Sequence, residues 1–134
     1  MDTKKILVVD DDPSVRELFE KALESPEYEV HGASDGVEAL ERIKDATFDL
    51  YLIDLMMPRM GGMDLLRALK EFDRETIVFI ITGLGSEESA REARELGCSD
   101  YITKPFDIDE VKTLIREALD ARDRGLRGGG SDRL

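Results

Sequence analysis

The sequence contains no tryptophan, one cysteine and no long apolar run. Because Cys98 has no partner in the chain, no internal disulfide can form, and we expect a small buried side chain rather than a reactive thiolate. No stretch approaches the roughly 20 apolar residues of a membrane span. The N-terminus reaches acidic residues directly after the short apolar run at residues 6–9, unlike a signal peptide. These absences predict a cytoplasmic protein that is not inserted in a membrane.

Basic residues are too few to balance the acidic ones. The chain has 31 Asp and Glu against 19 Lys and Arg, for a net charge of −12. Such a chain repels phosphate backbones and anionic membranes, so we expect no direct binding to nucleic acid or to membranes. Its 134 residues, 41% of them hydrophobic, fit one globular domain. A solvated acidic surface accounts for most of the charge, but not for three consecutive carboxylates at residues 10–12.

Strand-like and helix-like segments alternate five times. The first, third and fourth strand-like segments are short apolar runs, typical of strands buried on both faces of a parallel sheet, and the fifth is a short strand around Tyr101-Ile102. In the second, charged and apolar residues alternate, so we expect an edge strand. Five strand–helix units predict an α/β protein with a parallel sheet and helices on both faces. The strand-like segments lie at residues 6–9, 27–31, 50–53, 77–81 and 101–102.

The first helix-like segment begins at Asp12-Pro13, where Asp12 suits the N-cap and Pro13 the first helical position. Apolar residues then recur at spacings of three and one, which predicts one buried helix face. This face is expected to comprise Val15, Leu18, Phe19, Ala22 and Leu23.

The helix-like segment at residues 86–96 has a thin apolar stripe, mainly Ala90, Ala93 and Leu96. It is expected to be held only lightly to the core. Two interpretations remain open: a helix that a local change can shift, or a merely solvated helix. The last helix is expected to close a domain at residues 1–121. Residues 122–134 include a Gly-rich run at 128–131 and are expected to form a flexible tail or linker.

Polar residues follow four of the predicted strands. In open parallel sheets, chemistry lies at the carboxyl ends of the strands, where the strand order reverses. These ends bring three carboxylates, one hydroxyl and one ammonium group into one cleft. Any one of these residues alone has an ordinary structural interpretation as a turn, strand or surface residue, and only their coincidence indicates a site. They are Asp10, Asp11, Asp54, Thr82 and Lys104.

Clustered carboxylates repel one another by roughly 1 kcal/mol per pair at about 4 Å in water, and by more when partly buried. A site that keeps them ionised needs a cation, and oxygen ligands suit Mg²⁺ or Mn²⁺ rather than zinc. The only histidine, His31, is expected at the edge-strand surface. A metal beside a carboxylate nucleophile, with Lys and Thr opposite, is the set of groups that phosphoryl transfer requires.

The order and spacing of five motifs resemble the receiver domain of response regulators (CheY-like) over about residues 4–121. The resemblance implies a flavodoxin-like, doubly wound (βα)5 fold with strand order 2-1-3-4-5. The motifs are Val8-Val9-Asp10-Asp11, Ile53-Asp54-Leu55-Met56-Met57-Pro58, Met60-Gly61-Gly62, Ile81-Thr82-Gly83 and Tyr101-Ile102-Thr103-Lys104-Pro105-Phe106.

Several residue roles follow from the resemblance. Asp54 is implied to be the phospho-acceptor and a Mg²⁺ ligand. Asp11 is implied to bind Mg²⁺ directly, Asp10 largely through water, and Met56 through its backbone carbonyl. Lys104 is implied to pair with the acceptor carboxylate and then with the phosphoryl group.

Two further residues are implied to form the switch. Thr82 would hydrogen-bond the phosphoryl oxygen and be drawn inward, and Tyr101 would turn inward after it. The bond between Lys104 and Pro105 is implied to be cis, which only X–Pro bonds tolerate cheaply. The output surface of the family is formed by the fourth helix, fifth strand and fifth helix.

The implied function is a phosphorelay switch in a two-component system. The phosphoryl donor would be a sensor histidine kinase, a histidine phosphotransfer protein or a small phosphodonor. The output surface would signal to a downstream protein or output domain, with homodimerisation on phosphorylation as one outcome. Such a domain is not an enzyme; it catalyses only its own phosphorylation and dephosphorylation.

Two positions that vary between receivers tune the lifetime of the phosphoryl group, here Met56 and Leu84. Both are apolar and neither can orient an attacking water, so we expect a long lifetime.

The sequence argues against two alternative functions. An aspartyl-phosphate phosphatase has an Asp-x-Asp motif with its nucleophile after the first strand, and a cap insertion over the site; here the first-strand pair Asp10-Asp11 is adjacent, and no insertion is present. A receiver fold that is never phosphorylated usually lacks one of the acidic, Thr or Lys residues, and this sequence retains all of them.

Overall fold

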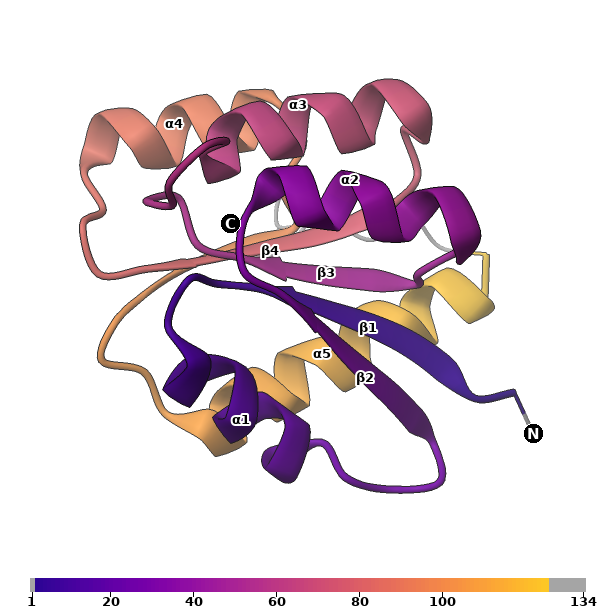
Figure 1. Cartoon of the computed structure of the whole chain (residues 1–134). Helices are drawn as coiled ribbons and strands as arrows, with labels where there is room; N and C mark the ends of the chain where they lie inside the picture. Colours follow the sequence, from indigo (N-terminus) through magenta and orange to yellow (C-terminus); the bar gives the residue numbers. More distant parts are fainter. Residues whose placement is uncertain (1, 126–134) are drawn as a thin grey trace.

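The chain forms a five-stranded parallel sheet, as the computed structural model shows for residues 2–125 (Figure 1). The strand order is β2-β1-β3-β4-β5, which confirms the predicted doubly wound topology. The strands are β1 (Lys4–Val9), β2 (Tyr28–Ala33), β3 (Leu50–Ile53), β4 (Ile77–Thr82) and β5 (Asp100–Thr103). The helices are α1 (Pro13–Ala22), α2 (Gly36–Asp45), α3 (Gly62–Phe72), α4 (Glu87–Glu95) and α5 (Ile108–Asp123).

Two helical layers cover the sheet: α1 and α5 lie on one face, and α2, α3 and α4 lie on the other (Figure 1). Successive strand residues point to opposite faces, so each strand contributes to two hydrophobic cores. In β1, Leu7 and Val9 belong to the core under α2, α3 and α4. Ile6 and Val8 belong to the core under α1 and α5. This explains why the central strands are continuous apolar runs.

Polar side chains cap the first turns of helices α1, α2 and α4. Asp12 caps α1 by accepting a hydrogen bond from the backbone N–H of Ser14, which confirms its structural role. Asp35 caps α2 through the N–H of Glu38. Ser86 and Ser89 form a reciprocal capping box at the start of α4.

One residue of the predicted α1 face is placed wrongly by the sequence pattern. Phe19 and Leu23 are buried in the core, as expected. Leu18 is 42% exposed. Because consecutive helical residues are about 100° apart, a helix that faces the sheet through Phe19 turns Leu18 toward solvent. The buried face of α1 is therefore narrower than its apolar stripe.

Strand β2 and the end of helix α5 were both addressed by the sequence pattern. Strand β2 is an edge strand, as its mixed pattern predicted. Helix α5 continues past residue 121 to Asp123. Arg122 donates to the Asp49 carboxylate at 2.6 Å, and Lys4 pairs with Asp123 at 2.8 Å. The expected Gly-rich tail lies outside the described residues.

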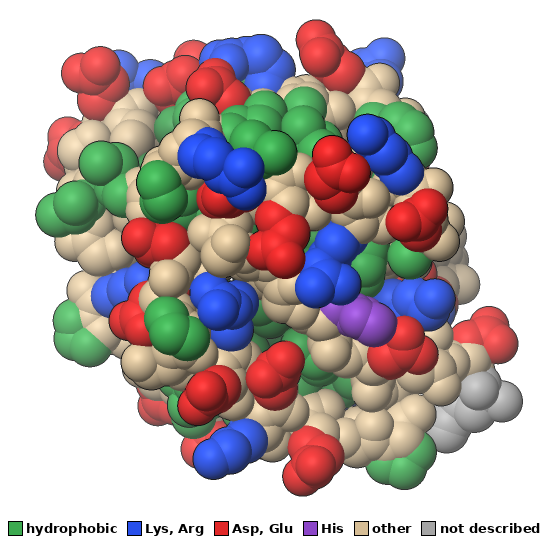
Figure 2. Space-filling model, viewed as in Figure 1, with side chains coloured by type: hydrophobic (Ala, Val, Ile, Leu, Met, Phe, Trp, Pro, Cys, Tyr) green, Lys and Arg blue, Asp and Glu red, His purple; other side chains and the backbone are tan. Residues whose placement is uncertain are grey.

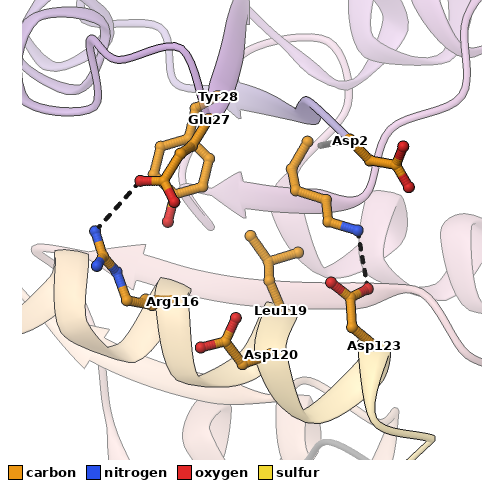
Figure 3. A pocket seen from close by; sticks show the side chains of 8 residues that line it. Asp2, Glu27, Tyr28, Arg116, Leu119, Asp120 and Asp123 are labelled. Carbon is orange, nitrogen blue, oxygen red and sulfur yellow. Dashed lines mark hydrogen bonds and ion pairs between the residues drawn. The ribbon is translucent and has the colours of Figure 1, made fainter.

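A polar pocket lies between the start of β1 and β2 and the second half of α5 (Figure 3). Lys4–Asp123 and Arg116–Glu27 are ion pairs that join its two sides. The pocket is at the amino ends of the strands, opposite the polar strand ends. Within the described residues, no helix is long and apolar enough to cross a membrane.

Candidate functional site

The register of the sheet brings Asp10 and Asp54 together. Val9 of β1 pairs with Ile53 of β3, so the next residue of each strand leaves the sheet at the same edge. The backbone N–H of Asp54 donates to the carbonyl of Val9 at 3.0 Å. Asp10 and Asp54 are both buried, whereas Asp11 is exposed.

The carboxylates of Asp10, Asp11 and Asp54 form one cluster. One oxygen from each lies within 4.8 Å of the others. Charged oxygens this close repel one another, and a hard divalent cation offsets that repulsion. The donor set contains oxygen only, which fits Mg²⁺ or Mn²⁺ and agrees with the expectation from sequence.

Lys104 reaches into the same cluster. Its Nζ donates to Oδ2 of Asp10 and to Oδ2 of Asp54, each at 3.1 Å. Its backbone N–H donates to the carbonyl of Thr82 at 2.8 Å, which fixes the loop after β5. The peptide bond between Lys104 and Pro105 is cis, as predicted.

Burial and neighbouring charges act in opposite directions on the pKa values of Asp10 and Lys104. Burial raises the pKa of the Asp10 carboxyl above its ordinary value, despite the hydrogen bonds from Asp12 and Lys104 that lower it. Burial lowers the pKa of Lys104, but the hydrogen bonds and charges of Asp10 and Asp54 outweigh it, and the net pKa is raised. Lys104 is therefore a cation at neutral pH.

Thr82 is the last residue of β4, and Tyr101 lies within the neighbouring strand β5, paired with Ile80. Thr82 is fully buried at the end of β4, and its Oγ1 accepts a hydrogen bond from the N–H of Leu84 at 3.3 Å. Tyr101 is half-buried and packs against the core under α4. Its hydroxyl lies 2.6 Å from Oγ of Ser89, inside the capping box of α4. This hydrogen bond links β5 to the start of α4.

The loop after Asp54 is tightly constrained at its junction with α3. The N–H of Met56 donates to Oδ1 of Asp54 at 3.1 Å, and the N–H of Gly62 donates to the carbonyl of Leu55 at 3.0 Å. A Cβ on Gly62 would lie 2.2 Å from the carbonyl oxygen of Asp54. Only glycine fits at this position.

Met56 and Leu84 follow Asp54 and Thr82 by two residues, and their side chains are 56% and 70% exposed. Their backbone N–H groups donate to Asp54 and Thr82. Met63 of α3 packs against the core under α2, α3 and α4. Cys98 is buried, and burial raises the pKa of its thiol to about 11, as expected for an inert filler.

Two arginines near the site were not singled out from sequence. Arg16 of α1 crosses Gly32 of β2 and donates to the backbone carbonyl of Asp10 at 2.6 Å. Arg59 donates twice to the Asp35 carboxylate. Neither contact has a sequence signal, because each depends on how a helix or loop packs over the sheet.

Comparison with known protein families and structures agrees with this geometry. The model of the response regulator receiver domain family matches residues 6–116. The chain is 34% identical to sporulation initiation phosphotransferase F of Bacillus subtilis over 119 residues, covering 89% of this chain and 96% of that protein. Two other curated relatives, both regulatory proteins, are far longer, and the chain spans about a quarter of their length.

Solved structures show the same fold. A CheY-like response regulator receiver domain protein from Methanospirillum hungatei superposes with a TM-score of 0.88 and 31% identity, covering 92% of this chain and 99% of that chain. Response regulator TrrA of Thermotoga maritima, solved in complex with Mg²⁺-BeF, has a TM-score of 0.76 and 29% identity, covering 86% and 98%.

The fold and the site define a doubly wound α/β protein with an acidic, lysine-bridged cluster at the carboxyl ends of its strands. The chain belongs to the receiver domain family of two-component response regulators. Receivers are signalling domains.

Proposed function

We propose that this receiver accepts a phosphoryl group on Asp54 in a Mg²⁺-dependent reaction. The observation that supports this most directly is the bridging of Asp10 and Asp54 by Lys104 beside the exposed carboxylate of Asp11. Asp54 thereby lies against the Lys104 ammonium and beside the oxygen atoms of two further carboxylates, a setting that suits a carboxylate nucleophile.

The residues that would hold the divalent cation are Asp10, Asp11, Asp54 and the backbone carbonyl of Met56. When bound, the cation neutralises charge on the phosphoryl oxygens. Mn²⁺ suits the same donors. The chain's own groups supply the rest of the charge compensation, since Lys104 already contacts two of these carboxylates.

A carboxylate oxygen of Asp54 attacks phosphorus, and the P–N bond of a donor phosphohistidine breaks as the new O–P bond forms. The electron pair of the broken bond goes to the imidazole of a histidine kinase or phosphotransfer protein. A small phosphodonor loses its leaving group in the same way. Lys104 follows the negative charge onto the phosphoryl group, and the hydroxyl of Thr82 donates to a phosphoryl oxygen. The chain catalyses only this transfer and the later hydrolysis, in which water attacks phosphorus, the bond to Asp54 breaks and inorganic phosphate leaves.

The output is a change in the surface formed by α4, β5 and α5. Small side chains attach α4, since only Ala90 and Ala93 of its residues are buried. When Thr82 turns to the phosphoryl group, Tyr101 moves inward and its hydroxyl leaves Ser89, which weakens the start of α4. Downstream proteins, an output domain or a second copy of the chain then bind the altered surface.

Beryllium fluoride with Mg²⁺ tests this proposal, because it mimics a bound phosphoryl group. Backbone amide NMR shifts are expected at Thr82, Lys104 and Tyr101 and along α4, and no such shifts are expected in Asp54→Ala. Shifts of equal extent in that variant, or shifts confined to Asp54 and its neighbours in the wild type, would contradict the switch.

A further inference from the structure

An ion pair holds the outer side of the loop that follows Asp54. Arg59 donates through Nε to Oδ2 of Asp35 at 2.7 Å and through Nη2 to Oδ1 at 3.1 Å. Two parallel bonds to one carboxylate define the orientation of both groups. The Asp35 side chain is 6% exposed and that of Arg59 is 59% exposed. Asp35 also caps α2 through Glu38, so the carboxylate is fixed and the loop is brought to it.

The backbone at Arg59 needs such support. Its φ is +66°, and the N–H of Met60 donates to the carbonyl of Pro58 at 2.7 Å, which makes Arg59 the centre of a tight three-residue turn. A positive φ at a residue with a side chain is strained, and it persists only where the surroundings enforce it. The N–H of Gly36 donates to the carbonyl of Met60 at 3.3 Å as a second tie to the start of α2.

Met56 lies between the two ends of this loop. One end is fixed at Gly62, which packs against the backbone of Asp54 and Leu55. Met56 does not anchor its own backbone by packing, because its side chain is mostly exposed. Its N–H is held by Oδ1 of Asp54, and Leu55 and Met57 on either side pack against the core. Among residues 2–125, no backbone N–H donates to its carbonyl, so the direction of this carbonyl is expected to depend also on the outer end of the loop, which the Asp35–Arg59 ion pair holds.

We propose that the Asp35–Arg59 ion pair is a positioning device for the cation site. It holds residues 55–61 in the conformation that presents the Met56 carbonyl beside Asp11 and Asp54, and thereby raises the affinity for Mg²⁺. This inference rests on the proposed function. Neither residue touches the cation; Arg59 acts through the loop, and Asp35 acts through Arg59.

The sign of the charge effect makes Arg59 the informative residue. Removing an arginine makes the chain more negative, which by itself strengthens cation binding. Loss of the ion pair is expected to weaken binding, so the two effects oppose each other. Arg59→Gln removes the ion pair, and Arg59→Gly removes it while adopting positive φ without strain. Arg67→Gln is the matched control, because Arg67 pairs with Asp64 and Glu92 on α3 and α4, away from the loop.

The experiment is titration of the whole chain with Mn²⁺, followed by the paramagnetic resonance of the free ion. Both Arg59 variants are expected to have a dissociation constant raised about tenfold, as for other residues that orient metal ligands. Arg67→Gln is expected to bind at least as tightly as the wild type. At saturating Mg²⁺, the Arg59 variants are expected to be phosphorylated by acetyl phosphate at nearly the wild-type rate.

Unchanged or tighter Mn²⁺ binding in a folded Arg59→Gln variant overturns the inference and leaves the proposed function intact. Arg59→Gly binding Mn²⁺ as tightly as Arg67→Gln would also overturn the inference. The turn would then hold the loop without the ion pair. A wild-type chain that binds no Mn²⁺ contradicts the proposed function itself.

Discussion

Asp10 is the residue at which folding and function most clearly oppose each other. It is a buried carboxylate beside two others, and burial raises its pKa. The folded chain therefore holds the Asp10 proton more tightly than the unfolded chain does. Stability falls as the pH rises through the titration of this group, and the ionised form costs stability at neutral pH.

Asp10→Asn is therefore expected to stabilise the chain at pH 7 in the absence of divalent cations. The gain is about 1 kcal/mol, because Asn removes the buried charge whose loss of hydration is the main cause of the raised pKa. It is expected to disappear near pH 3, where carboxylates are largely protonated. Thermal unfolding at both pH values measures this. Asp12→Asn is the control, because hydrogen bonds from Ser14 lower the pKa of Asp12 and its loss should not stabilise.

Met56 and Leu84 are expected to slow the loss of the phosphoryl group, because neither side chain orients water. Met56→Asn with Leu84→Glu should lose the label faster than the wild type, on the order of tenfold or more. The measurement is the decay of the phosphorylated mass after the donor is removed. Phe72→Asn, which changes an exposed apolar residue at the far end of α3, should leave the decay unchanged. Equal decay in all three proteins would contradict the role of these two positions.

The carboxylate cluster and Lys104 were predictable, because parallel strands end at one edge and polar residues there must meet. The contacts of Arg16 and Arg59 were not. Both are long side chains whose partners depend on loop geometry, and the turn at Arg59 contains no glycine to mark it.

At the scale of elements, the junction between β3 and α3 tolerates the least change. Gly62→Ala would place a Cβ 2.2 Å from a backbone oxygen, and backbone cannot move aside as a flexible side chain can. We expect a loss of about 2–3 kcal/mol or more in the free energy of unfolding, by the usual cost of overpacking. Gly83→Ala is the matched control, because its nearest contact is 3.8 Å away on the Lys104 side chain. Denaturant unfolding compares the two, and similar midpoints would refute the constraint.

Helix α4 is the element that is easiest to move. Tyr101→Phe removes the hydrogen bond to Ser89, which is worth about 1 kcal/mol. Amide exchange in α4 is expected to become severalfold faster, while exchange in α3 and α5 stays constant. Tyr28→Phe on β2 is the control. If exchange in α4 is unaffected by Tyr101→Phe, the hydroxyl does not hold the helix.

The elements were predictable from periodicity, but their exact buried faces were not. The apolar runs of β1, β3 and β4 identified buried strands because both faces of each are covered. Leu18 was assigned to a buried face because the pattern shows apolar spacing and not the tilt of α1 on the sheet. The switch interpretation of α4 remains a prediction, since a thin stripe is common to movable and merely solvated helices.

At the scale of the whole molecule, the acidic side chains are distributed over the surface, whereas at the candidate site they are clustered. Acidic and basic side chains alternate over the face seen in Figure 2, which agrees with a solvated surface despite the net charge of −12. Among residues 2–125, the group of three carboxylates close enough to share a cation lies where the strand order reverses. One cation there would bridge β1 and β3, so binding should couple directly to the stability of the central sheet.

The most direct test of the account is the intact mass of the chain after incubation with acetyl phosphate and Mg²⁺. Asp54→Ala and a metal-free sample serve as controls. We predict one added phosphoryl group in the wild type and none in either control. A folded wild-type chain that gains no mass, or an Asp54→Ala variant that gains as much, would contradict phosphorylation on Asp54.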